Sequence, residues 1–238
     1  MKKLFLLLSG LIFGLGAAGR AAHGEAAGTS FSERVILGWH VKVSTALERD
    51  HAALVEQSLA LLEKELAAIV AAVPPQRLPQ LRRATFWLDE RVPQGAVQDQ
   101  VPVFHPNPQW LKEHGLNPHM AGGIELPNAG YFLTTYSWEP WAILHELAHF
   151  YQNTVLGDDN AEIHHAYEAA RAAHLYDSVQ HYDGKTLPAY ARENEREYFA
   201  ELSEAYFGRN DFFPFTRADL EAYDPLGFAT VRSMWERL

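Results

Sequence analysis

The hydrophobic and polar positions divide the chain into a strand-rich first half and a helical second half. Residues 35–43 are rich in β-branched and aromatic side chains, and residues 83–89 alternate apolar and polar positions, so both segments predict strands. Between them, residues 51–73 repeat leucine and isoleucine at helical spacing, and Pro74 and Pro75 end the predicted helix.

Proline and glycine mark the boundary between the halves. They are frequent in residues 91–108, which predict a loop, and short strands are predicted at 123–126 and 131–135. After Pro140 the pattern is helical to the end. The predicted helices cover residues 140–155, 160–177, 193–207, 216–223 and 225–237.

This order of elements is typical of an α+β fold, in which strands and helices are segregated along the chain. We expect a small mixed or antiparallel sheet with an N-terminal helix, followed by a mostly helical C-terminal lobe. One domain of two lobes should cover residues 23–238, since the sequence shows no internal repeat.

The first residues have the pattern of a secretory signal. Lys2 and Lys3 precede an apolar run over residues 4–18, and small residues follow. The run is shorter than the roughly 20 residues that a membrane-spanning helix needs. We therefore expect a cleaved signal peptide over residues 1–22 rather than a membrane anchor, and a secreted or periplasmic protein with no stable membrane span.

The composition excludes several kinds of functional site. The 238 residues include no cysteine, which excludes disulfides, cysteine nucleophiles and thiolate-bound metals. Asp and Glu number 30 against 20 Lys and Arg, and this acidic balance argues against a nucleic-acid-binding protein. Any metal must therefore be bound by carboxylates and by the 12 histidines.

One motif carries specific chemistry. His145-Glu146-Leu147-Ala148-His149 places two imidazoles one helical turn apart, on the same face, so that both can reach one ion. Glu146 lies next to the first ligand, where it can take a proton from a metal-bound water. The alternative interpretation is two partly buried structural histidines on a core helix.

A zinc hydrolase needs a third protein ligand and a free position for water. Gln152 and Val155 stand where a longer histidine motif requires glycine and histidine, so that arrangement is absent. Asp158 and Asp159 follow soon after, but no supporting pattern surrounds them.

A third ligand on a later helix fits better. Glu197 and Glu201 are four residues apart in the predicted helix 193–207, so one carboxylate can bind the metal while the other orients a ligand imidazole. The alternative is a solvated helix face, although the intervening residues are apolar and aromatic.

The run Tyr190-Ala-Arg-Glu-Asn194-Glu-Arg-Glu197-Tyr-Phe-Ala-Glu201 resembles the second half of the active site in the anthrax lethal-factor-like zinc peptidases. These are gluzincins, which combine His-Glu-x-x-His with a downstream glutamate on a zincin-like fold. The resemblance implies that Glu197 is the third zinc ligand and Tyr190 the catalytic tyrosine. It also implies that Glu201 and Asn194 support the ligands.

The resemblance covers about residues 140–207. Residues 205–216 are also similar to small secreted proteins regarded as metallopeptidases, like the fungal conidiation-specific secreted proteins. The first 130 residues do not resemble the toxin, so the substrate is not carried over.

Together these features predict a secreted zinc metallopeptidase that acts on a peptide or protein. One Zn²⁺ should be held by His145, His149 and Glu197, with Glu146 as general base and Tyr190 as hydrogen-bond donor to the oxyanion. We expect residues 123–135 to form a sheet edge that pairs with an extended substrate. Two alternatives stay open: another zinc amide hydrolase, such as a cell-wall amidase, and an inactive zinc-containing binding module.

The sequence predicts no functional role for the other histidines. His164, His165, His174 and His181 are expected to be solvated, and His105 is expected to be an incidental residue of the loop 91–108.

Overall fold

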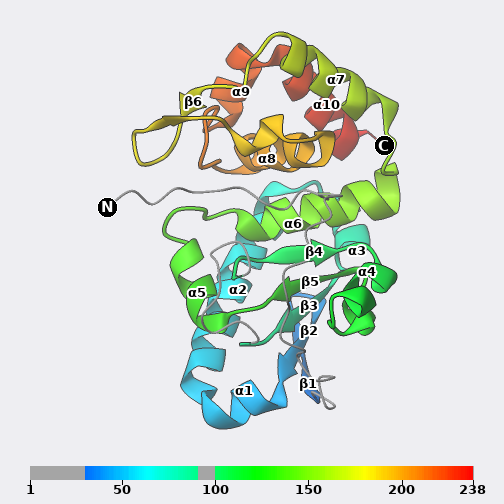
Figure 1. Ribbon diagram of the computed structural model, residues 1–238, viewed down its shortest axis with the longest axis vertical. Helices are drawn as coiled ribbons and strands as arrows, with labels where there is room; N and C mark the ends of the chain where they lie inside the picture. Colours follow the sequence, from blue (N-terminus) through cyan, green and yellow to red (C-terminus); the bar gives the residue numbers. More distant parts are fainter. Residues whose placement is uncertain (1–29, 91–99, 238) are drawn as a thin grey trace, which may run out of the picture.

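The structure is a computed structural model that describes residues 30–90 and 100–237 (Figure 1). The predicted signal peptide, residues 1–22, lies outside the described residues. Among the residues described, no helix is both long and apolar enough to cross a membrane.

A mixed five-stranded sheet forms the first half of the chain, as the sequence predicts. The strand order is β1-β2-β3-β5-β4. The three inner strands run parallel, and the two outer strands pair antiparallel to their neighbours. The strands are β1 (Phe31–Ile36), β2 (Trp39–Ser44), β3 (Thr85–Leu88), β4 (Val103–His105) and β5 (Gly123–Leu126).

The single strand predicted over residues 35–43 is instead part of a hairpin. Leu37 and Gly38 have positive φ angles of 50° and 95°, which turn the chain between β1 and β2. The β-branched residues continue on both sides of this turn, so composition alone does not reveal it.

The substrate-binding edge predicted at residues 123–135 is wrong. Residues 131–135 belong to helix α5 (Ala129–Thr135), because the Asn128 side chain accepts a hydrogen bond from the Tyr131 amide and starts a helix. β5 is paired on both sides, and the edge strand next to it is β4, inside the segment predicted as a loop.

One face of the sheet forms the main core. Val41, Phe86, Ile124 and Phe104 lie in register across four strands, and all four are buried. The helix predicted at 51–73 is α2 (Ala52–Ala72), which packs into this core. The other elements of the first half are α1 (Thr45–Asp50), η1 (Pro75–Arg77), α3 (Leu78–Leu81), α4 (Pro108–Glu113) and η3 (Pro118–Met120).

The second half is mostly helical, as predicted. Its elements are α6 (Ala142–Tyr151), the π-helical turn η4 (Gln152–Leu156), α7 (Ala161–Ala172), β6 (Val179–Gln180), β7 (Thr186–Leu187), η5 (Tyr190–Arg192), α8 (Glu195–Phe207), α9 (Arg217–Tyr223) and α10 (Pro225–Glu236). α6 lies between the sheet and the group formed by α7 to α10 (Figure 1).

Two contacts fix the start of α6. Trp141 packs so tightly against Gly208, just after α8, that a Cβ at Gly208 would lie 1.9 Å from the indole ring. The Glu65 carboxylate of α2 accepts a hydrogen bond from the Ile143 amide in the first turn of α6. The helix that carries the His-Glu-x-x-His motif is therefore held from both lobes.

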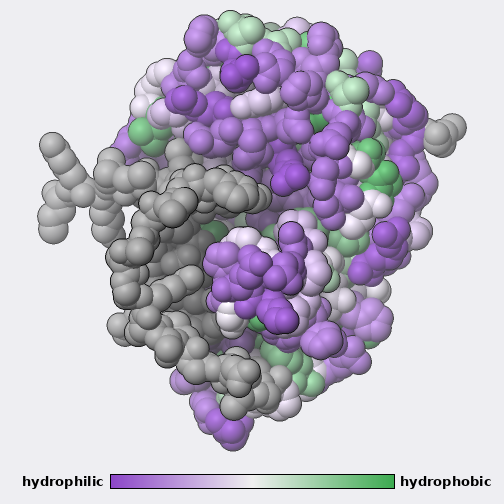
Figure 2. All heavy atoms as spheres, turned by 45° about the vertical axis from the view of Figure 1, so that its right-hand side comes forward, coloured by the Kyte–Doolittle hydropathy of each residue, from purple (hydrophilic) through white to green (hydrophobic). Residues whose placement is uncertain are grey.

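The described residues visible in Figure 2 are mostly hydrophilic, with hydrophobic side chains in small separate patches. This distribution is typical of a solvated surface.

Candidate metal centre

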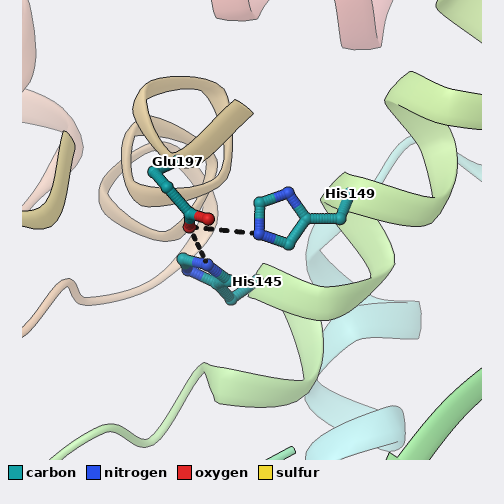
Figure 3. A group of neighbouring side chains, drawn as sticks. All are labelled: His145, His149 and Glu197. Carbon is teal, nitrogen blue, oxygen red and sulfur yellow. Dashed lines mark hydrogen bonds and ion pairs between the residues drawn. The ribbon is translucent and has the colours of Figure 1, made fainter. Parts of the chain in front are cut away.

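Three ligand atoms, two from α6 and one from α8, converge where these two helices pack against each other (Figure 3). Oε2 of Glu197 lies 3.0 Å from Nε2 of His145 and 3.2 Å from Nε2 of His149. Metal–ligand bonds of about 2.0–2.1 Å in a tetrahedral zinc site place ligand atoms about 3.3 Å apart. Both distances from the Glu197 oxygen to the imidazole nitrogens are therefore close to those in such a site.

The three ligand side chains are not equally covered. His145 and Glu197 are buried, whereas the side chain of His149 is 13% exposed. His149 is therefore the most exposed of the three ligands.

Asn194 sets the position of Glu197. Its side chain caps α8 by accepting hydrogen bonds from the Arg196 and Glu197 amides. The resemblance assigned Asn194 a supporting part, and the structure shows that this support reaches Glu197 through the backbone.

The carboxylate that orients His145 belongs to Glu204, not to Glu201. Nδ1 of His145 lies 2.7 Å from Oε1 of Glu204, whereas Glu201 accepts a hydrogen bond from Nδ2 of Asn210. The role predicted for Glu201 is therefore wrong. Residues seven apart on an α-helix differ by only about 20° in direction, so Glu204 shares the face of Glu197 one turn beyond Glu201.

Glu146 lies outside the group of ligands. Its Oε2 accepts a hydrogen bond of 2.6 Å from the Phe104 amide of the edge strand β4. Burial raises the pKa of the Glu146 carboxyl above its ordinary value. A raised pKa suits a group that must both take and return a proton.

Tyr190 lies beside the first ligand. The centroid of its ring is 6.2 Å from that of the His145 imidazole, with the planes 26° apart. The structure thus brings together His145, Glu146, His149, Tyr190 and Glu197, five residues that the sequence singled out.

The protein charges around the ligands favour a cation. Although burial opposes its charge, the two imidazoles hold the pKa of Glu197 well below its usual range. Burial also opposes the charge on His145, but Glu197 and Glu204 raise the pKa of its imidazole well above the ordinary value. Protons therefore occupy this site readily, and a metal must displace them to bind.

Further carboxylates lie behind His145, and the sequence interpretation did not group them. We call Glu139, Glu201, Glu204 and Asp211 the acidic cluster. Burial, followed by the charge of its neighbours, raises the pKa of Glu139 and of Glu201 well above the ordinary value. Burial raises that of Glu204 to about 7.

Among the other histidines, His105 differs from its interpretation. It is buried on β4, and its Nε2 lies 2.8 Å from Oε2 of Glu125 on β5. It is therefore part of the sheet rather than of a loop. His164, His165 and His174 are exposed, as expected, whereas His181 is half-buried and pairs with Asp183 and Asp211.

Comparison with known proteins gives no relative. No protein-family model matches the chain, and neither a curated protein nor a solved structure matches it.

Proposed function

We propose that this protein is a zinc metallopeptidase in which His145, His149 and Glu197 hold one Zn²⁺. The observation that carries the proposal is one carboxylate oxygen that lies within hydrogen-bonding distance of two Nε2 atoms, with all three atoms within 4.8 Å of one another. Nitrogen and oxygen donors suit zinc, and three protein ligands leave a fourth position for water. That ligand count is typical of catalytic rather than structural zinc sites.

The chemistry divides among the neighbouring side chains. A zinc ion in this site would supply Lewis acidity and a water whose pKa is lowered toward about 7. Glu146, adjacent to a ligand in the sequence, would act as the general base that accepts a proton from the attacking water and returns one to the leaving amine. Tyr190, beside His145, donates a hydrogen bond to the oxygen on which negative charge develops.

The proposed substrate is a peptide in extended conformation. β4 is an edge strand, and its Phe104 amide contacts Glu146, so a chain paired with β4 passes next to the general base. The proposal that the protein is secreted rests on the sequence pattern of residues 1–22 alone.

Zinc content and hydrolysis of a mixed peptide library test this proposal together. We expect one zinc per chain and cleavage that a chelator abolishes. Glu146→Gln should retain the zinc and lose at least about 10²-fold in turnover. Glu221→Gln, a change at an exposed glutamate of α9, serves as the matched control.

Three outcomes would each contradict part of this proposal. Peptide hydrolysis that survives in a clean preparation of Glu146→Gln removes the proposed base. An intact peptide library, with zinc bound and another amide cleaved, favours the amidase alternative. A protein that binds zinc and cleaves neither substrate fits the inactive binding module.

A further inference from the structure

The acidic cluster behind His145 has more carboxyl groups than positively charged partners. Within residues 30–90 and 100–237, the ion pairs of its four carboxylates are with histidine alone: Glu204 with His145, and Asp211 with His181. Glu201 has the neutral amide of Asn210 as its partner. Buried carboxylates ordinarily require a counter-charge, a bound metal or a proton.

One carboxylate oxygen in the cluster is buried and makes no hydrogen bond to the described residues, so it could bind a cation. Glu204 is 0% exposed, and its Oε2 has no hydrogen-bond partner among the described residues. Ligand atoms of Glu139, Glu204 and His145 lie within 4.8 Å of one another. Glu201 is 2% exposed and Asp211 is 7% exposed, so two more carboxylates contribute charge from inside the protein.

We propose that the acidic cluster binds one hard divalent cation such as Ca²⁺, with Glu139 and Glu204 as its principal ligands. Ca²⁺ takes six to eight oxygen ligands and accepts carboxylates together with water. The cluster offers the carboxylate oxygens, whereas the zinc centre offers mainly imidazole nitrogen. The two sites therefore select different ions.

The cation has an approach from solvent. Glu139 is only half-buried, and a pocket of about 210 Å³ lies beside it, lined by Ser137, Trp138, Pro140, Tyr182, Arg209 and Asn210. Asn210 connects this pocket to the cluster through its hydrogen bond to Glu201. Water in the pocket can complete the coordination of an ion held by Glu139 and Glu204.

A cation in this place acts on the zinc centre through Glu204. That carboxylate would bind the cation through one oxygen while Oε1 stays hydrogen-bonded to Nδ1 of His145. The cation then stabilises the cluster and fixes the carboxylate that orients the imidazole. The inference does not require the protein to be a peptidase.

Calcium binding to the zinc-loaded full chain tests this inference. Equilibrium dialysis with radioactive calcium, at constant ionic strength, should show one saturable ion per chain. At a calcium concentration about a hundred times the Kd, the midpoint of thermal unfolding should rise by about 5–10 °C. The absence of saturable binding would overturn the inference.

Matched variants locate the ion. Glu139→Gln and Asp211→Asn should each weaken calcium binding at least about tenfold, whereas Glu221→Gln should leave it unchanged. Glu139→Gln should unfold at a higher temperature than the wild type in calcium-free buffer, because an amide neither repels the neighbouring carboxylates nor has to take up a proton when the chain folds. The order should reverse in calcium. Binding that is unchanged in both cluster variants would overturn the assignment, and either variant suffices if the other does not fold.

The two proposals fail separately. His149→Ala should lose zinc and keep calcium, because His149 belongs to the zinc centre alone. Calcium binding without any peptide hydrolysis would reject the peptidase and retain the cation site.

Discussion

Each ring nitrogen of His145 faces a different carboxylate, and this arrangement decides which nitrogen is available to a metal. Nδ1 is engaged with the Glu204 carboxylate, so Nε2, which lies 3.0 Å from Oε2 of Glu197, is the nitrogen that a metal can bind once it has lost its proton. The environment of one imidazole therefore connects the zinc centre to the acidic cluster.

Glu204→Gln should weaken zinc binding by about 10- to 100-fold, because a neutral amide orients and polarises His145 less than a carboxylate does. Competition with a chromophoric chelator in calcium-free buffer measures this affinity. Glu201→Gln is the matched control on the same helix and should have a smaller effect. A larger loss of zinc in Glu201→Gln than in Glu204→Gln would restore the role that the sequence gave to Glu201.

Tyr190→Phe should lower kcat by about 10²- to 10³-fold, the usual loss for one donor to an oxyanion, and leave zinc content unchanged. Steady-state kinetics on a cleaved library peptide gives kcat and KM separately. Tyr182→Phe, at an exposed tyrosine, should change neither constant by more than about twofold. Full activity of Tyr190→Phe would remove this residue from the mechanism.

Zinc affinity should depend on pH. The two carboxylates raise the pKa of His145, so the imidazole holds a proton up to a pH above 6.5 and competes with the metal. The apparent affinity should therefore be highest above the pKa of His145 and fall about tenfold for each unit of pH below it. Chelator competition from pH 5 to 8 measures the slope, and a flat profile contradicts the proposed ligand.

At the scale of elements, helix α8 positions two of the three proposed zinc ligands. Its cap fixes Glu197, and the two-turn spacing to Glu204 supports His145 from the same face. Asn194→Ala should cost about 1 kcal/mol of stability and also weaken zinc binding, because the first turn contains a ligand. Asn160→Ala, which uncaps α7, should cost a similar amount and leave zinc affinity unchanged. Equal zinc affinity in the two variants would contradict this.

The helices that the sequence predicts correctly are those marked by patterns within a short stretch of the chain. Helical periodicity and prolines predicted α2 and the helices from α6 onward. The motif spacing predicted that His145 and His149 share a face, and the family resemblance implied Glu197 as the third ligand.

Three elements could not be predicted in this way: the hairpin at Leu37 and Gly38, the short edge strand β4 and helix α5. Each depends on a single turn or cap, and the composition of the surrounding residues favours a different structure. Which carboxylate contacts His145, Glu204 or Glu201, depends on how α6 packs against α8. The hydrophobic periodicity of each helix does not determine this packing.

At the scale of the whole molecule, Glu65 joins the two lobes. It is 4% exposed on α2 and accepts from the Ile143 amide of α6, and burial raises the pKa of its carboxyl to about 8. Because the folded state holds this proton more tightly than the unfolded state, Glu65 contributes its full stability below about pH 4.5. That contribution is lost as the pH rises through 8.

Glu65→Gln keeps the acceptor and removes the titration. It should therefore be more stable than the wild type at pH 9, by up to about 4 kcal/mol, and similar at pH 4. Urea unfolding at pH 4, 7 and 9 measures the difference, with Glu63→Gln on the exposed face of α2 as control. A constant difference across this range would show that Glu65 does not titrate as its burial requires.

The position of zinc in a crystal tests the central claim most directly. Anomalous diffraction on either side of the zinc absorption edge, from crystals of the zinc-loaded protein, locates the ion without reference to activity. The account predicts one peak about 2.0–2.1 Å from Nε2 of His145, Nε2 of His149 and a carboxylate oxygen of Glu197. A zinc peak bound by other residues, or no peak among these three in fully loaded protein, would contradict it.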